Sequence, residues 1–353
     1  MKNIKWLVFI LVCICLAGII AGCSQKAGEA TQPEQTEQTE QTEQSAVPAE
    51  KVTLKAIAGG VGGGWYTVLA GISEVVGRID SGINMQTVPG GGLINPPRVG
   101  TKDVDMGLVF PPFLKTAYEG TAPFDTAYPD LRGLMKGFGV TYAQFVVAEE
   151  SGLTSIKDVI DKKYPIKVAV DRVGTTDEWL FSKLLAFYNV DYKTIESWGG
   201  KVTHAGYGDQ AVLYKDGHVD AIFGNIAVPW TAAMEANIAK KIKILPLDED
   251  LQKYLMDEFA FGKGEISAGS YGDDVVTEAI PTVTSLTALM VHKDVPEDVV
   301  YRITKIICEN VDDIRATHDS AKEFDPKNEV WKDVGAPLHP GAEKYYKEAG
   351  FIQ

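Results

Sequence analysis

Cysteines are too few in this chain of 353 residues to form a disulfide framework. Of the four, Cys13 and Cys15 lie in an apolar N-terminal stretch, and Cys23 directly follows it. Only Cys308 remains in the rest of the sequence, so intramolecular pairing there is excluded. Cys308 lies in an amphipathic helical pattern, where a lone cysteine is typically a small core residue.

Residue patterns of several common catalytic and metal sites are also missing. The five histidines are far apart and no cysteine pair accompanies them, so the sequence offers no zinc-binding set. No serine lies in a Gly-x-Ser-x-Gly motif. The glycines of residues 59–64 lack both the lysine of a phosphate loop and the spacing of a dinucleotide fingerprint. We therefore expect no metal and no cofactor.

Positive charge is scarce. The chain has 34 Lys and Arg residues against 48 Asp and Glu residues, which gives a formal net charge of −14. Nucleic acid and anionic lipid surfaces both require a basic field, so we expect neither as a partner. The charge of a small ligand is set by its local site, and this balance does not decide it.

The N-terminal region has the layout of an exported lipoprotein. Residues 1–22 carry two lysines, an apolar run and small residues, which is typical of a secretory signal peptide. The residues Ile20-Ala21-Gly22-Cys23 resemble the bacterial lipobox, whose cysteine is lipidated after cleavage. An uncleaved membrane helix is the alternative, but the apolar run is short of the ~20 residues that a span needs. We predict an extracytoplasmic protein, attached to the cell membrane by lipid on Cys23.

Residues 23–50 continue from the lipid site as a polar segment. A Glu-Gln-Thr triplet repeats there, with no aromatic residue and almost nothing apolar. Such a segment cannot bury enough surface to offset its ordering entropy. We expect it to be a disordered tether.

The remaining residues, 51–353, exceed what one compact core usually holds, so two lobes are expected. An apolar strand at residues 55–58 precedes a helical pattern, and a second strand at Lys167–Val170 precedes a capping box at residues 175–178. A further amphipathic helix is predicted over residues 296–310. Repeated strand–helix units favour an α/β fold, with a mostly parallel sheet flanked by helices in each lobe.

Glycine-containing loops precede three of the predicted helices and are candidate ligand sites. Glycines let the backbone approach a ligand, and the first N–H groups of a helix attract an anion. The alternative is that these loops are tight turns and caps, with aromatic side chains in the core. Three such loops favour a ligand, because α/β sheets bind ligands at the carboxyl ends of their strands. The candidates are Gly63, Gly64, Trp65, Tyr66, Gly92, Asn95, Gly174, Thr175 and Thr176.

Two segments of the chain resemble each other. Residues 102–108 and 216–222 both place Val-Asp before a strand, and an aromatic segment with proline follows each. Two lobes of similar plan would put these segments on opposite walls of a cleft, whereas coincidence between two ordinary strand starts is the alternative. The segments add Phe110, Asn225 and Trp230 to the candidates.

Several motifs follow one another along the body of the chain. They are Gly-Gly-Gly-Trp-Tyr at 62–66, Val-Pro-Gly-Gly-Gly at 88–92 with Asn-Pro at 95–96, Val-Asp-Met-Gly at 104–107, Gly-Thr-Thr at 174–176, residues 217–223 and the ending at 339–348. In this order they resemble the TAXI family of solute receptors, which serve tripartite ATP-independent periplasmic (TRAP) transporters. Trp65-Tyr66 and Pro97 depart from the commoner family pattern, which leaves the identity of the ligand open.

The resemblance implies a two-lobed fold of the type II periplasmic-binding class, with the ligand cleft between the lobes. Residues 51–143 with 283–353 would form lobe I, and residues 144–282 lobe II. The helices from residue 296 onward would pack on lobe I. The implied ligand is a small carboxylate or amino acid of the glutamate, glutamine or 2-oxoglutarate type, which a monomeric receptor delivers to a TRAP-type permease.

Two other functions remain open. A solute-sensing lipoprotein that docks to a membrane signalling partner would use the same cleft. An extracytoplasmic enzyme would need an acid–base pair from Asp105, Asp177 or Asp209, but Asp105 fits a strand start and Asp177 the first turn of a helix. For the receptor we expect Trp65→Ala and Asn95→Ala to weaken binding with little loss of fold stability.

Overall fold

The computed structural model describes residues 51–272 and 274–353 of the chain, and these belong to one compact unit. The predicted signal peptide, the lipid site at Cys23 and the tether lie outside the described residues. Among the helices of the described ranges, none is both long and apolar enough to cross a membrane.

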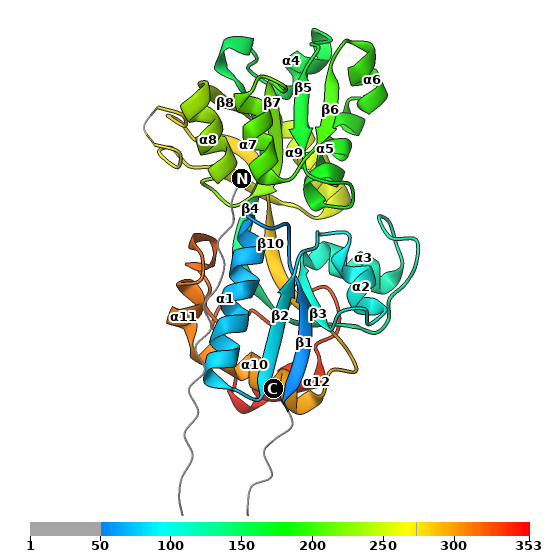
Figure 1. Cartoon of the computed structure of the whole chain (residues 1–353). Helices are drawn as coiled ribbons and strands as arrows, with labels where there is room; N and C mark the ends of the chain where they lie inside the picture. The colour runs from blue at the N-terminus through cyan, green and yellow to red at the C-terminus, as the bar shows by residue number, and fades with distance from the viewer. Residues whose placement is uncertain (1–50, 273) are drawn as a thin grey trace, which may run out of the picture. The chain divides into compact units, whose positions relative to one another are not determined.

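Strands and helices alternate along the chain, as the sequence predicts (Figure 1). Helix α1 buries Val68, Leu69 and Ile72 of its apolar stripe, whereas Ile79, the last residue of the helix, is 44% exposed. The elements up to the first long strand are β1 (Val52–Ile57), α1 (Gly64–Ile79), β2 (Ile83–Val88), α2 (Asn95–Gly100), β3 (Met106–Val109), α3 (Pro111–Glu119) and β4 (Leu131–Ala148).

The second part of the chain repeats this plan. Strand β5 has the predicted bounds, and Thr175 caps α5 by accepting a hydrogen bond from the Glu178 backbone N at 3.3 Å. The elements here are η1 (Glu149–Ser151), α4 (Ile156–Asp161), β5 (Lys167–Val170), α5 (Thr176–Phe187), α6 (Tyr192–Ser197), β6 (Lys201–His204), α7 (Tyr207–Lys215), β7 (Ala221–Ile226), α8 (Thr231–Ala239), β8 (Ile242–Leu245), α9 (Glu249–Phe259) and β9 (Gly262–Ile266).

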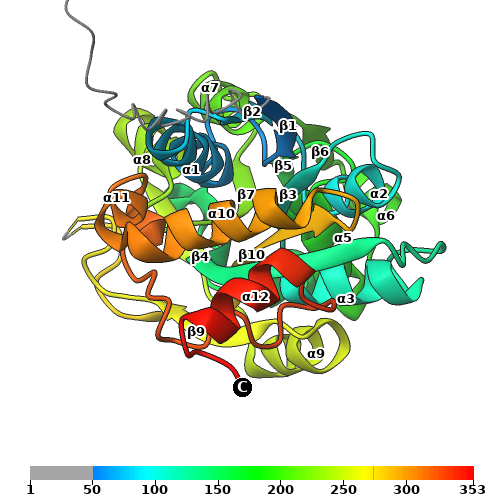
Figure 2. The same ribbon diagram turned by 90° about the horizontal axis from the view of Figure 1, so that it is seen from below.

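A second long strand and the C-terminal helices complete the fold. Helix α10 buries Val299, Val300, Ile303 and Ile307, as its sequence pattern predicts, and Cys308 is buried beside them. It packs against α1 and α12 (Figure 2). The elements are β10 (Ile280–His292), α10 (Glu297–Glu309), α11 (Val311–Arg315), η2 (Asp319–Ala321) and α12 (Pro340–Glu348).

One mixed sheet runs through both lobes in the order β2-β1-β3-β10-β4-β7-β5-β6, with β8 on β4 and β9 on β10. Strands β2, β1 and β3 are parallel and form lobe I with α1–α3 and α10–α12. Strands β7, β5 and β6 are parallel and form lobe II with α4–α9. The two long strands, β4 and β10, are antiparallel to each other and to their neighbours, which makes the sheet mixed.

Strands β4 and β10 connect the lobes (Figure 1). Strand β4 pairs with β10 along its first part, and from Tyr142 onward it also pairs with β7. Strand β10 pairs with β9 up to Thr284 and with β3 from Ala288. Each strand therefore changes partners near its middle. The predicted lobe boundaries, at 143–144 and 282–283, fall within these two strands.

Candidate functional site

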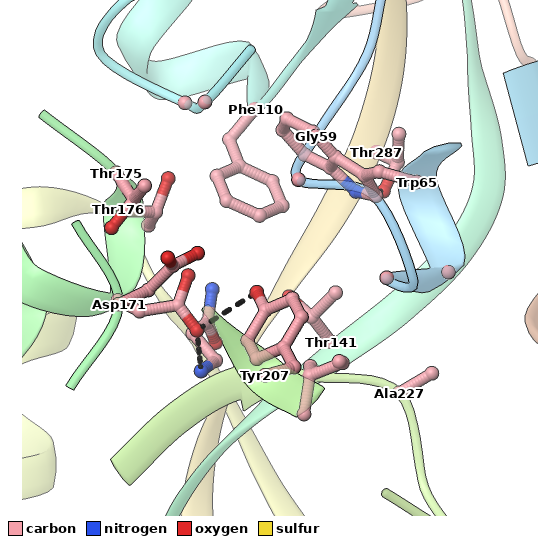
Figure 3. A pocket seen from close by; sticks show the side chains of 18 of the residues that line it. Gly59, Trp65, Phe110, Thr141, Asp171, Thr175, Thr176, Tyr207, Ala227 and Thr287 are labelled. Atoms are coloured by element: carbon pink, nitrogen blue, oxygen red, sulfur yellow. Dashed lines mark hydrogen bonds between the residues drawn. The ribbon is translucent and has the colours of Figure 1, made fainter. Parts of the chain in front are cut away.

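Segments that follow the parallel strands of both lobes border one cleft (Figure 3). Lobe I contributes the start of α1, the glycines of residues 90–92 after β2, and Phe110 after β3. Lobe II contributes Asp171 after β5, the start of α5, Tyr207 at the start of α7, and Asn225 in β7. Ligands of α/β folds bind at the carboxyl ends of parallel strands, so this cleft is the candidate site.

The two walls of the cleft touch directly. The backbone N of Leu93 donates a hydrogen bond across the cleft to the carbonyl oxygen of Gly174 at 3.3 Å. A Cβ atom at Gly92 would lie 1.8 Å from Oγ1 of Thr176, so a larger residue would push the walls apart or force that threonine to turn. The lobes are therefore in a closed arrangement.

Aromatic rings form the lobe I wall. The Trp65 ring lies 4.7 Å from the Phe110 ring between centroids, and its Nε1 donates to Oγ1 of Thr287 at 2.8 Å. This hydrogen bond ties the start of α1 to the long strand β10. Next to the cleft, Phe113 of α3 packs edge-on against Trp179 of α5 at 5.0 Å, which adds an apolar contact between the lobes.

Two aspartates of lobe II line the cleft with almost no solvent exposure. Asp177, in the first turn of α5, is 5% exposed. Its Oδ1 accepts hydrogen bonds from the Asn225 backbone N at 2.7 Å and from the Tyr207 hydroxyl at 3.2 Å. Burial, and secondly the charge of Asp171, raise the pKa of Asp177 to about 7. Asp171 is 1% exposed, and its Oδ1 accepts from the Arg172 backbone N at 2.7 Å.

Arg172 is the basic side chain that contacts Asp171. Its Nε lies 3.3 Å from Oδ1 of Asp171, but the side chain is 60% exposed, at the rim. Within the described residues, no lysine, arginine or histidine belongs to the lining of the cleft. The lobe II wall therefore holds two acidic side chains, which the sequence-based expectation of an acidic ligand did not include.

Several polar groups in the cleft are free to bind a ligand. The side-chain amide of Asn225 and the hydroxyl of Thr176 have no hydrogen-bond partner in the described part of the chain, although the two residues are only 4% and 3% exposed. Buried polar groups are normally hydrogen-bonded. On the opposite wall, the backbone N–H groups of Gly64 and Trp65 open α1 and, like the first amides of any helix, lack a partner within it.

Eight of the twelve predicted ligand-binding residues line this cleft. They are Gly63, Gly64, Trp65, Gly92, Phe110, Thr175, Thr176 and Asn225. They come from both lobes, so the two similar sequence segments do contribute opposite walls, through Phe110 and Asn225. The four that do not line it are Tyr66, Asn95, Gly174 and Trp230.

Asn95 supports the cleft from behind, which corrects its predicted contact with the ligand. It is completely buried, and its Nδ2 donates to the carbonyl oxygens of Ala58 and Leu108 at 2.7 and 2.8 Å. Its Oδ1 accepts from the Gly91 backbone N at 2.9 Å. The side-chain amide of Asn95 thus connects the segments after β1, β2 and β3, and it makes its hydrogen bonds with the protein backbone.

The other three residues lie near the cleft but outside its lining. Trp230 is 2% exposed and packs its ring beneath Gly224 of β7. Tyr66 borders a separate groove between α1 and the α11 segment, together with Arg78 and Asp313. Gly174 contacts lobe I through its carbonyl group, as described above. Their roles as ligand contacts stay predictions from the sequence.

The acid–base set considered for an enzyme is not assembled. Asp177 lines the cleft, but Oδ2 of Asp105 accepts from the Lys55 backbone N at 2.7 Å, and Asp209 is exposed on α7. The residues described by the structure also contain no group of three His, Cys, Asp or Glu side chains that could hold a metal ion.

Sequence reasoning missed Asp171, Tyr207, Thr141 and Thr287 of the lining. Asp171 directly follows the buried strand β5, as Phe110 follows β3, and Tyr207 opens a helix after a glycine. The position of Asp171 after a strand and that of Tyr207 after a glycine could have identified both residues from the sequence. The two threonines lie within the long strands β4 and β10, where no local pattern identifies them.

The fold is that of the periplasmic binding proteins. MatC from Rhodopseudomonas palustris, solved with bound malate, is 14% identical with a TM-score of 0.52, and the match covers 86% of this chain and 98% of that chain. The periplasmic binding protein BugD is 15% identical with a TM-score of 0.50, and the match covers 86% and 99% of the two chains. The predicted two-lobed α/β fold is thereby confirmed.

A match over residues 57–350 assigns the family: the chain belongs to the NMT1-like family. Its relatives and structural neighbours are periplasmic solute-binding proteins. The narrower resemblance to the TAXI receptors stays a prediction.

Proposed function

We propose that this protein is a solute receptor, held outside the cytoplasm by lipid on Cys23, that captures a small carboxylate or amino acid and delivers it to a TRAP-type permease. Family membership and fold support the receptor role. The lipobox-like residues 20–23 support the anchor, and the order of the sequence motifs supports the TAXI assignment and its permease partner.

One observation carries the proposal: a cleft between two lobes holds buried polar groups with unused hydrogen-bonding capacity. Thr176 and Asn225 provide them on the lobe II wall. On the lobe I wall, Gly64 and Trp65 line the cleft at the start of α1, where their N–H groups lack a partner within the helix. A carboxylate at these amides gains from the helix dipole and from hydrogen bonds that contribute on the order of 1 kcal/mol each.

Capture and release follow from the two connecting strands. A solute that contacts both walls stabilises the closed arrangement through the contacts that the open arrangement cannot make. Strands β4 and β10 span both lobes, so a change within them moves one wall relative to the other. No bond of the solute is made or broken, and the permease would reopen the cleft by binding the receptor.

Binding can be tested on the chain without residues 1–22, with Cys23 replaced by serine so that it stays in solution. Mass spectrometry of the purified protein should identify a co-purifying small molecule. Calorimetry against glutamate, glutamine, 2-oxoglutarate, malate and neutral amino acids should give one-to-one binding for at least one of them. The absence of both a co-purifying molecule and any binding heat would refute the proposal.

A pair of asparagine variants tests the position of the site. Asn225→Ala removes a buried amide of the cleft, and we expect it to weaken binding roughly tenfold or more, the loss of one to two hydrogen bonds. Asn328→Ala, at an exposed position outside the cleft, should bind like the parent protein. Equal affinities for the two variants would place the site elsewhere.

A further inference from the structure

We infer that the captured solute carries a protonated amino group, which the carboxylates of Asp177 and Asp171 bind in the closed cleft. The inference rests on the proposed receptor function and narrows its ligand: amino acids fit this cleft, and 2-oxo acids and other carboxylates without an amino group do not.

Asp177 lacks compensation for its charge. The donors to its Oδ1, the Asn225 backbone N and the Tyr207 hydroxyl, are both neutral. None of the ion pairs of the described residues includes Asp177. Burial, and secondly Asp171, raise its pKa to about 7, the response of a carboxylate without a cationic partner. A cation from the ligand would supply that partner.

Asp171 adds a second carboxyl group to the lobe II lining, beside Asp177. Its Oδ1 is held by the Arg172 backbone N and contacts the exposed guanidinium at the rim. Its Oδ2 lies 3.8 Å from the position that a Cβ atom of Gly60 in lobe I would take, and Nη2 of Arg172 lies 3.0 Å from the same position. Figure 3 shows the Asp171 carboxylate on the same side of the cleft as Thr176, opposite Trp65 and Phe110. Both acids therefore line the space between the lobes, and Arg172 at the rim offsets part of the charge of Asp171 alone.

The rest of the lining favours the same chemistry. The lobe I wall, opposite the two acids, consists of glycines and of the rings of Trp65 and Phe110. The face of an aromatic ring attracts a cation. The unpartnered hydroxyl of Thr176 and amide of Asn225 lie beside the acids and can accept N–H donors. The helix starts remain available for one carboxylate. A 2-oxo acid would bring only negative charge to a wall that already holds two acidic side chains.

Matched pairs of solutes test this inference, because an amino acid and its 2-oxo acid differ only at the amino group. We would measure affinities by calorimetry for glutamate and 2-oxoglutarate, alanine and pyruvate, and leucine and its 2-oxo acid. The member with the amino group should bind at least tenfold more tightly in every pair that binds. Equal or tighter binding of the oxo acid would overturn the inference but leave the receptor function intact, whereas no binding by any solute would remove both.

The dependence of affinity on pH is a second test, because it has opposite signs for a ligand with an ammonium group and for a ligand with only a carboxylate. An ammonium group binds the ionised acid, so affinity should rise by up to about tenfold per pH unit toward pH 7 and then level off. A carboxylate that accepts a proton from neutral Asp177 would instead bind more weakly as the pH rises. Tyr207 stays a neutral donor throughout, because burial raises its pKa well above the usual value.

Variants assign this pH dependence to Asp177. Two histidines lie near the cleft: the His318 ring is 3.1 Å from the position that a Cβ atom of Gly64 would take, and His204 lies 4.0 Å from Glu178 of α5. Asp177→Asn should lower amino-acid affinity at least tenfold at pH 8 and flatten the profile between pH 6 and 8. Asp250→Asn, exposed on α9, should change neither. An unchanged profile in Asp177→Asn, or binding that a metal chelator abolishes, would overturn the inference.

Discussion

At the scale of single residues, Asp177 links the cleft to the stability of the fold. Burial raises its folded-state pKa to about 7, above the ordinary value of 3.8. Folding without ligand therefore favours the protonated carboxyl. Its contribution to stability is complete below pH 4 and is lost as the pH rises through 7, a change of roughly 4 kcal/mol at most.

Asp177→Asn should remove this pH dependence, because an amide cannot ionise but can still accept from Asn225 and Tyr207. We expect the ligand-free variant to be more stable than the parent protein, with a gain that grows from pH 5 to pH 8. Urea unfolding at the two pH values measures it. A gain that is equal at both values would show that Asp177 is not the titrating group.

Asn95 should affect folding rather than binding, in contrast to the expectation from the sequence. Its three buried hydrogen bonds hold the segments after β1, β2 and β3, so Asn95→Ala should cost about 3 kcal/mol of unfolding free energy. Trp65→Ala removes a ring that lines the cleft and should act mainly on affinity. Urea unfolding and calorimetry of both variants separate the two effects, and similar stabilities would contradict this assignment.

The candidate residues were predictable where a local rule describes them. A glycine before a helix indicates that the backbone can approach a ligand closely, and this rule identified Gly63, Gly64 and Gly92. Asp177 was considered only as an acid or base of an enzyme and was not counted among the ligand contacts, because a first-turn position already explains an aspartate there. Its burial depends on Tyr207 and Asn225, which lie far along the chain and which no local pattern connects to it.

At the scale of elements, the strand–helix units were predictable and the long strands were not. Units such as β5 with α5 show apolar periodicity and a cap within a short window. Strand β4 is 18 residues long and nearly all of it is shielded from solvent, because it crosses both lobes and is covered on both faces. It therefore lacks the alternation that identifies a strand with one exposed face.

Gly137, in the middle of β4, should be a position where only glycine is unstrained. Its φ is +111°, whereas a Cβ atom there would make only ordinary contacts with Phe324 and Val330. We expect Gly137→Ala to lower the unfolding free energy by about 1 to 2 kcal/mol through backbone strain alone. Gly208→Ala, in open space on α7, should be neutral or slightly stabilising. Thermal unfolding of the two variants tests this, and equal midpoints would contradict it.

At the scale of the whole molecule, length and repeated units indicated two lobes, but no sequence pattern indicated that they touch. The contact depends on pairs such as Gly92 with Thr176, which lie in different lobes and satisfy no local rule. The same pairs set how far the cleft can close. Closure is therefore a property of the tertiary arrangement and is best tested at the point of contact.

Gly92→Ala should hold the lobes apart without changing either one. The added Cβ atom meets Thr176 of lobe II only in the closed arrangement, where relieving the overlap costs about 1 to 3 kcal/mol, a factor of roughly 5 to 100 in affinity. The melting temperature of the ligand-free protein should stay close to that of Gly208→Ala, whose methyl group meets nothing. Small-angle scattering should show that ligand compacts Gly208→Ala but compacts Gly92→Ala less. Full compaction with parental affinity in Gly92→Ala would mean that the ligand-bound receptor does not use this contact between its walls.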